Sequence, residues 1–309
     1  MNKMASLIKK NIYLNPWRIM KKFNYLYYKE ICAKHILYSN PIHCKSPDPL
    51  EVHMLTGEKA VIESMWCLKT FYKFIDLSLR LVIHDDGTLS NKSISIFYNH
   101  FKGVKIIKKD EADKKIITNL KGYDYSMKYR IDNYMPHSIK LIDFFYFSKN
   151  SFLALDSDVL FFKKPMEVLR FLEEGKGFYM SDYRNSYSLS REDLGSHYNF
   201  EILPRINTGL FFVPSEMIYD KLAIEDSLKL CYENNYPMKQ WTEQTVFAVI
   251  FSKYKENFQR LSNNYQISRT PITDETVSHH FVNDGSRTLF YIDGIRKLRN
   301  SKTFINKNN

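Results

Sequence analysis

The sequence lacks the glycine-rich motifs that mark two large classes of nucleotide-binding protein. It contains neither Gly-Lys-Ser nor Gly-Lys-Thr, so there is no Walker A loop, and its single Gly-x-Gly is Gly175-Lys176-Gly177. P-loop and dinucleotide-binding proteins are therefore excluded, because each class holds phosphates on such a loop.

Cysteine is scarce and never closely paired. The four cysteines (Cys32, Cys44, Cys67 and Cys231) form no Cys-x-x-Cys, which argues against a thiolate zinc site. Their wide spacing in a chain of 309 residues also argues against a disulfide framework. We therefore expect reduced thiols and a cytoplasmic protein.

Long apolar runs are absent as well. No window approaches the roughly 18–20 apolar residues that a membrane span needs. Asn11, Asn15 and Arg18 interrupt the apolar residues that follow the first lysines, so no signal peptide is expected. An apolar content of 44% with 26% charged residues is typical of a globular chain with a sizeable core.

The formal net charge of +11 is concentrated at the two ends. Residues 1–46 carry nine basic side chains and one acid (Glu30), and residues 294–309 carry five basic side chains and no acid, which leaves −2 for the body between them. Proteins that bind nucleic acid usually carry basic residues over one face of the folded body. Because the body of this chain is nearly neutral, no nucleic-acid partner is expected. We expect a basic helical extension (1–46), a body (47–293) that starts in a proline-rich linker, and a basic tail (294–309).

The N-terminal extension carries an amphipathic helix pattern that begins at Pro16. Trp17, Met20, Phe23, Tyr27 and Ile31 recur at three- and four-residue spacing and form one apolar stripe. We expect this stripe to pack on the body. The alternative is a peripheral helix that lies on an anionic membrane surface.

From residue 51 onward, strand and helix patterns alternate. Strands are expected at 51–55, 79–84, 104–107 and 152–155, and helices at 59–74, 90–101, 113–120 and 138–147. This alternation predicts an α/β fold with a mostly parallel central sheet flanked by helices. Such sheets bind ligands at the carboxyl ends of their strands, so Thr56-Gly57, Asp85-Asp86 and Asp156-Ser157-Asp158 should be neighbours.

Asp156-Ser157-Asp158 is the sharpest feature of the sequence. It directly follows the apolar run Phe152–Leu155 and precedes another one, Val159–Phe162. Two carboxylates at this spacing can bind one hard cation, and Mg²⁺ and Mn²⁺ share such ligands with phosphates. A strand-end turn with solvated acids is the structural alternative.

In this context Asp156-Ser157-Asp158 resembles the metal-binding Asp-x-Asp of GT-A-type glycosyltransferases, and other segments resemble glycosyltransferase family 8, the glycogenin-like group. The segments that carry the resemblance are Val52–Gly57, Lys140, Ile206–Phe212 with its Asn-x-Gly, Trp241–Thr245, and His280-Phe281 with Arg287. The chain departs from the pattern where Glu243 replaces Asp, Asn283 replaces Gly, and Arg287 stands one residue after the family's Lys. The resemblance covers about 51–287 and implies a GT-A (Rossmann-like) catalytic domain over 47–293.

The resemblance also implies roles for individual residues. Asp156, Asp158 and His280 would bind Mn²⁺ or Mg²⁺, with His279 as an alternative ligand. The nucleotide-sugar donor would be held by Thr56, Gly57, Lys140, Asn207, Gly209 and Arg287. The donor sugar or the acceptor hydroxyl would face Glu243, Gln244 and Asp182, unless Thr242 simply caps a helix in that polar cluster.

The implied activity is metal-dependent transfer of a sugar from a nucleotide-diphosphate sugar, by default a UDP-sugar, to a hydroxyl group of a glycan or glycolipid. Glu243 would be the general base of an inverting enzyme, whereas a retaining enzyme would use a diphosphate oxygen as the base. The sequence is compatible with both stereochemical outcomes. A nucleotidyltransferase is disfavoured because Leu55-Thr56-Gly57-Glu58 has a single glycine. A non-catalytic scaffold is disfavoured because the candidate metal ligands and a basic partner are all retained. The sequence does not indicate the oligomeric state.

Overall fold

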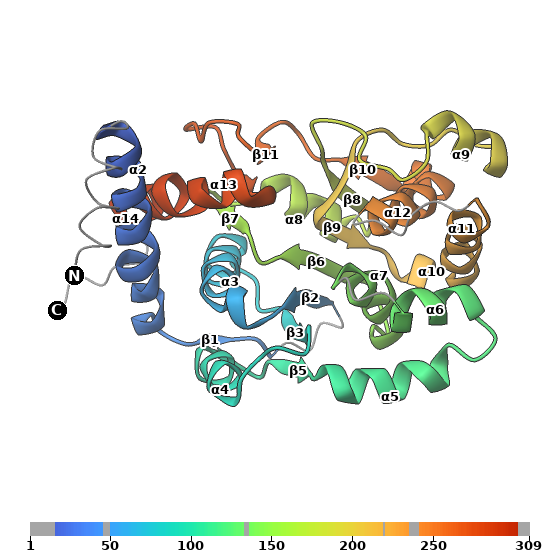
Figure 1. Cartoon of the computed structure of the whole chain (residues 1–309), viewed down its shortest axis with the longest axis horizontal. Coiled ribbons are helices and arrows are strands. Elements are labelled where there is room, and N and C mark those ends of the chain that lie inside the picture. Colours follow the sequence, from blue (N-terminus) through green and yellow to red (C-terminus); the bar gives the residue numbers. More distant parts are fainter. Residues whose placement is uncertain (1–15, 46–49, 133–135, 219, 235–240, 302–309) are drawn as a thin grey trace, which may run out of the picture.

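The structure is a computed structural model that describes residues 16–45, 50–132, 136–218, 220–234 and 241–301. A seven-stranded sheet runs through the middle of the molecule in the order β10-β8-β9-β6-β2-β3-β5 (Figure 1). Its strands are β2 (Glu51–Thr56), β3 (Arg80–Asp85), β5 (Lys105–Ile107), β6 (Phe152–Asp156), β8 (Gly177–Ser181), β9 (Ile206–Val213) and β10 (Phe258–Arg260). Only β9 is antiparallel to its neighbours. The predicted α/β fold is confirmed, and the four expected strands lie within one residue of their predicted bounds.

Helices flank this sheet. They are α3 (Val61–Ile75), α4 (Asn91–His100), α5 (Lys109–Asn119), α6 (Asp124–Asp132), α7 (His137–Phe147), α8 (Met166–Glu173), α9 (Arg191–Tyr198), α10 (Ser215–Ile218), α11 (Lys221–Glu233) and α12 (Trp241–Lys253), with single turns η3 (Glu58–Ala60) and η4 (Lys255–Asn257). Ser90 caps α4 by accepting a hydrogen bond from the Ser93 backbone N–H at 3.2 Å. The alternative in which Thr242 caps a helix is wrong, because α12 already includes Trp241 and Thr242 lies inside the helix.

The remaining strands of the described residues form two smaller sheets. One joins β11 (Tyr265–Ile267), β12 (Ser278–His280) and β7 (Val159–Phe161), and the other pairs β1 (Ile42–His43) with β4 (Phe101–Lys102). β12 runs antiparallel to β7, which directly follows the Asp-x-Asp segment. This pairing ties a late part of the chain to the end of the central strand β6.

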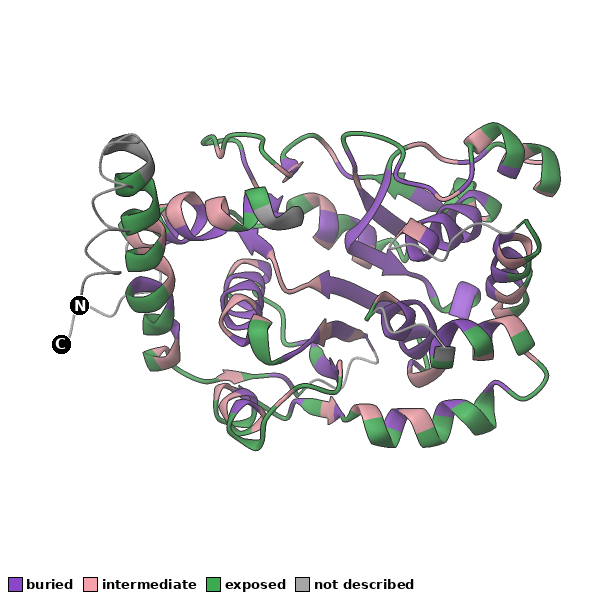
Figure 2. Cartoon of the chain, viewed as in Figure 1, coloured by how far each residue is buried: buried purple, intermediate pink, exposed green. Residues whose placement is uncertain are grey.

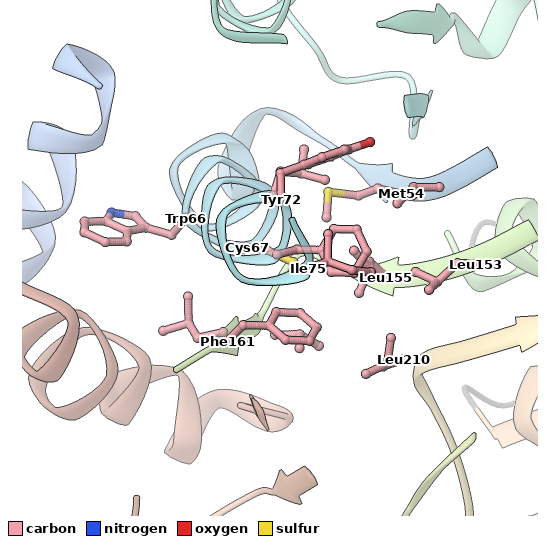
Figure 3. Packing of buried hydrophobic residues seen from close by; sticks show 14 of the residues in the cluster. Met54, Trp66, Cys67, Tyr72, Ile75, Leu153, Leu155, Phe161 and Leu210 are labelled. Carbon is pink, nitrogen blue, oxygen red and sulfur yellow. The ribbon is translucent and has the colours of Figure 1, made fainter. Parts of the chain in front are cut away.

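The core occupies both faces of the central sheet and follows the alternation of each strand. On β6, Leu153 and Leu155 belong to the cluster around α3, whereas Phe152 and Ala154 belong to the cluster built with α7 and α12. Figure 3 shows the first cluster closing around α3, and Figure 2 shows burial along the strands and the inner sides of the helices. Burial on both faces explains why β6 is apolar without interruption.

The two ends of the described chain pack against each other at one end of the molecule (Figure 1). The first end is α2 (Pro16–Tyr27), continued by the π-helical turn η1 (Tyr28–Cys32) and the 3-10 helix η2 (Ala33–Tyr38); the last is α13 (Asn283–Leu289), the π-helical turn η5 (Phe290–Ile295) and α14 (Arg296–Asn300). The rings of Tyr25 and Tyr291 meet edge-to-face, with centroids 5.7 Å apart. No helix among the described residues combines the length and apolarity that crossing a bilayer requires. The predicted boundary between residues 46 and 47 lies outside the described residues.

The expectation that the apolar stripe of α2 packs on the body is wrong. Met20, Phe23, Tyr27 and Ile31 are 51%, 69%, 44% and 52% exposed. The helix instead turns the side of Tyr25 toward η5, because aromatic contacts with Tyr291 hold that side in place. The side chain of Trp17 is outside the described part of the structure.

Candidate active site

The carboxyl ends of β2, β3 and β6 meet along one edge of the sheet. The strand register pairs Leu55 with Asp156 and Thr56 with Asp85, so the three predicted turns are neighbours, as expected. β9 runs in the opposite direction and therefore begins at this edge. A cavity of about 530 Å³ lies here. It is lined by eleven of the twelve residues that the sequence singled out: Thr56, Gly57, Lys140, Asp156, Asp158, Asp182, Asn207, Glu243, Gln244, His280 and Arg287.

Asp156, Asp158 and His280 form a cluster whose potential ligand atoms all lie within 4.8 Å of one another. His280 Nε2 lies 3.1 Å from Asp158 Oδ1 and 3.6 Å from Asp156 Oδ2. Two carboxylates and one imidazole are a donor set that suits Mn²⁺ or Mg²⁺, with positions left for phosphate oxygens. The residues present therefore fit a divalent cation.

Strand pairing brings His280 to the two aspartates. His280 is opposite Val159 in the β12–β7 ladder, and the backbone N–H of Phe281 donates to the Asp158 carbonyl oxygen at 3.0 Å. Asn207 Oδ1 accepts hydrogen bonds from the Gly209 backbone N–H at 3.0 Å and from His280 Nδ1 at 2.8 Å. An acceptor at Nδ1 directs Nε2 toward the carboxylates, as a metal-ligating imidazole requires.

Gly209 of β9 lies directly against the imidazole ring of His280. A Cβ at this position would lie 2.2 Å from His280 Nδ1, so only glycine lets the ring come this close to the β9 backbone. Gly209 is the one predicted site residue that does not line the cavity.

His279 lies on the other side of β12. Its Nε2 is 2.9 Å from the Thr270 carbonyl oxygen, and its ring stacks on Phe281. Burial lowers the pKa of His279 to about 4. Successive side chains of a strand point to opposite faces, so the two adjacent histidines lie on opposite sides of β12. Of the two, only His280 belongs to the candidate metal cluster.

Charge pairing governs the protonation of the cluster. Burial alone would lower the pKa of His280, but the carboxylate charges of Asp158 and Asp156 raise it. Burial alone would raise the pKa of Asp158, but the charge and hydrogen bond of His280 lower it. These opposite charges favour a protonated imidazole, whose Nε2–H can donate a hydrogen bond to Asp158.

Lys140 is a buried cation that joins two acidic residues. Its Nζ lies 2.7 Å from Asp156 Oδ1 and 3.4 Å from Glu243 Oε1, and it donates to the Thr208 carbonyl oxygen. The contact with Glu243 is at ion-pair distance, and Glu243 Oε1 has no hydrogen-bond donor among the residues that the structure describes. Burial alone would lower the pKa of Lys140, and the two carboxylate charges raise it, which keeps the amine charged.

Glu243 and Gln244 enter the cavity from the first turn of α12. The amide nitrogen of Gln244 donates to Asp182 Oδ2 at 3.2 Å and also to the Ile206 carbonyl oxygen. Asp182 Oδ1 in turn accepts from the Tyr183 backbone N–H at 2.7 Å. The three predicted sugar-facing residues are therefore neighbours, although they come from two separate segments.

Further residues line the cavity that the sequence interpretation had not assigned to the site. Asp86 lies beside Gly57, where a Cβ would come within 2.1 Å of its Oδ2. The strand-end rule had already placed Asp86 at this edge. The guanidinium of Arg184 lies over the ring of Trp241, 5.5 Å from its centroid, and both line the cavity. No sequence signal pointed to that pair, because it forms only where the segment after β8 meets the first turn of α12.

No protein-family model matches the chain, and no curated protein matches it in sequence. Solved structures do match. Galactosyltransferase LgtC, crystallised with donor and acceptor sugar analogues, superposes with a TM-score of 0.53 at 11% identity, over 83% of this chain and 98% of LgtC. Mouse xyloside xylosyltransferase 1 gives a TM-score of 0.50 at 13% identity, over 80% and 99%. The chain has the fold of these glycosyltransferases.

The bifunctional glycosyltransferase WbbM also matches, with a TM-score of 0.51 at 9% identity, over 79% of this chain and 47% of WbbM. Together these matches bear out the predicted GT-A-like architecture. At such low identities they show the fold, and the chemistry has to be argued from the cavity itself.

Proposed function

We propose that this protein is a divalent-metal-dependent glycosyltransferase that uses a nucleotide-diphosphate sugar, by default a UDP-sugar, and a hydroxyl acceptor on a glycan or glycolipid. The observation that carries the proposal is the cluster of Asp156, Asp158 and His280, which faces the cavity of a GT-A-like fold. Lys140 and Arg287 add positive charge to the same cavity. We place the enzyme in the cytoplasm, since its four cysteines are all unpaired.

The charges in the cavity suit a leaving group that is rich in negative charge. A Mn²⁺ or Mg²⁺ ion held by Asp156, Asp158 and His280 would supply Lewis-acid stabilisation of the departing diphosphate. The Arg287 side chain is 59% exposed, and its Nε lies 3.9 Å from Asp158 Oδ2, so the guanidinium is free to turn to a phosphate. Both contributions lower the barrier for breaking the sugar–oxygen bond.

The polar residues opposite the cluster suit the sugar and the acceptor. We assign the donor-sugar hydroxyls to Gln244 and Asp182, and the nucleoside to Thr56 and Gly57. Glu243 would take the acceptor proton in an inverting reaction and stabilise positive charge on the sugar in a retaining one. In either case a bond from the anomeric carbon to the acceptor oxygen replaces the bond to the diphosphate.

Calorimetry with UDP, and with GDP as the control nucleotide, tests the proposal directly. We expect UDP to bind in the presence of Mn²⁺ and not in its absence. Asp158→Asn should weaken that binding at least roughly tenfold, because it removes one charged ligand from the cluster. Asp193→Asn is the matched control, since Asp193 is an exposed residue of α9 that does not line the cavity.

A screen of UDP-sugars for slow hydrolysis then identifies the donor. Absence of nucleotide binding under every metal condition would make the Asp-x-Asp a strand-end turn and the protein a scaffold. Release of pyrophosphate from a nucleoside triphosphate and a sugar phosphate would instead indicate a nucleotidyltransferase. Either result would overturn the proposal.

A further inference from the structure

The outer face of α2 is apolar and uncovered by the described part of the chain. Ile19, Met20, Phe23, Leu26 and Tyr27 are 44%, 51%, 69%, 45% and 44% exposed. At 100° per residue, these five side chains fall within an arc of about 120° on one side of the helix. A contiguous apolar patch of this kind usually marks a contact surface.

The opposite side of α2 holds the helix on the body. Tyr25 packs edge-to-face on Tyr291, and Lys29 Nζ lies 5.4 Å and 5.9 Å from the centroids of these two rings. Figure 2 shows α2 coloured as exposed over most of its described residues, at one end of the molecule. The apolar arc is therefore presented by a fixed helix.

Basic side chains accompany the arc. Lys22 is exposed and borders the arc in the helical projection. The charge of Arg299, on α14, lies within electrostatic range of the Tyr27 phenol. A neighbouring groove of about 360 Å³ lies between α2 and η5, and Lys21 and Arg296 are among the residues that line it. The guanidinium of Arg296 forms an ion pair with the Asp293 carboxylate at 3.1 Å. In all, residues 16–38, which form α2, η1 and η2, carry five basic side chains and one acid, and residues 294–301 carry three basic side chains and no acid.

We propose that this end of the molecule docks on an anionic lipid bilayer, with the apolar arc of α2 buried at the boundary of headgroups and acyl chains. Apolar side chains flanked by Lys and Arg are the pattern of helices that lie in the plane of a membrane. A second copy of the chain suits the surface less well, because a two-fold contact through this face would bring two strongly basic ends together. The helix would lie on the bilayer, since it is too short to cross it.

Co-sedimentation of the full chain with vesicles tests this surface. The probes are phosphatidylcholine vesicles and vesicles in which about one third of the lipid is phosphatidylglycerol. We expect binding to the anionic vesicles alone, weakened at least roughly fivefold when salt is raised from about 0.1 M to about 1 M. Phe23→Glu combined with Leu26→Glu should weaken binding by more than roughly tenfold, because it places charges in the buried arc.

Matched control variants separate this face from general effects. Leu222 of α11 is 63% exposed. Since α11 lies at the opposite end of the molecule from α2 (Figure 1), Leu222→Glu should bind vesicles like the wild type. Lys21→Glu with Lys22→Glu should lose binding, whereas Lys114→Glu with Lys121→Glu, on and after α5, should keep most of it. Thermal unfolding checks that each variant is folded.

Three results would overturn the proposal. The first is equal binding to neutral and anionic vesicles, and the second is unchanged binding by the Phe23→Glu and Leu26→Glu double variant. The third is a dimer in sedimentation velocity that the double variant loses, because a second copy would then cover the arc. None of these results depends on nucleotide binding. The proposal of a membrane-binding surface and the proposal of a glycosyltransferase activity are therefore tested independently.

Discussion

Asn207→Ala tests how the structure prepares His280 for a cation. The amide oxygen of Asn207 accepts from both the Gly209 backbone N–H and His280 Nδ1, so the imidazole must carry a hydrogen on Nδ1 and turn Nε2 to the aspartates. Removing such a partner of a metal-ligating histidine typically costs a factor of 10–100 in affinity, or about 1.4–2.7 kcal/mol. The buried Gly209 N–H loses its acceptor too, which should lower the free energy of unfolding by about 1–3 kcal/mol.

Titration calorimetry with Mn²⁺ in the presence of UDP measures the affinity, and urea unfolding measures the stability. Asn185→Ala is the matched control, because Asn185 also accepts a backbone hydrogen bond, from Arg205 at 2.8 Å, but does not line the cavity. We expect it to bind Mn²⁺ like the wild type. The reasoning is refuted if Asn207→Ala keeps wild-type affinity under conditions in which His280→Ala loses binding.

Gly209→Ala should weaken Mn²⁺ binding at least roughly tenfold in calorimetry, because its Cβ would displace the His280 ring; unchanged affinity would show that the ring can move without cost. Lys140→Met should lower the free energy of unfolding in urea by about 3–5 kcal/mol, because two carboxylates lose a buried counter-charge. A loss below about 1 kcal/mol would contradict that role. Lowering the pH from about 7 to about 5 should lower Tm, because burial lowers the pKa of His84 while the unfolded imidazole takes up a proton near a pKa of about 6.5. The contribution of the neutral His84 to stability is thus present above that pKa and lost below it. His84→Phe should therefore make Tm less dependent on pH, and an equal slope of Tm against pH in the two proteins would contradict this role of His84.

Local patterns were sufficient to predict four of the seven strands of the central sheet and the sheet edge at which the cavity lies. β6 is apolar because it is buried on both faces, and its Asp-x-Asp falls at the strand end because the chain leaves the core there. The strand-end rule needs no knowledge of distant contacts, which is why it also placed Thr56 and Asp85 correctly.

Contacts between distant segments were not predictable in the same way. An amphipathic pattern identifies the apolar side of α2 but not what lies beside it, and here Tyr25 on the other side makes the packing contact. The pairing of β12 with β7 is likewise invisible in the short segment Ser278–His280, because three residues carry almost no strand pattern. Lys140 was expected near a diphosphate, but its position between Asp156 and Glu243 required the fold.

The β12–β7 pairing has a consequence for how the protein is made. During synthesis the N-terminal part of a chain emerges and begins to fold first. Asp156 and Asp158 are therefore translated long before His280, the third member of their cluster. A ribosome-bound or truncated chain can hold most of the central sheet and still lack the imidazole that completes the candidate cation site. Under the proposed function, metal-dependent nucleotide binding would begin only after β12 has paired with β7, so it would report that this late strand is in place.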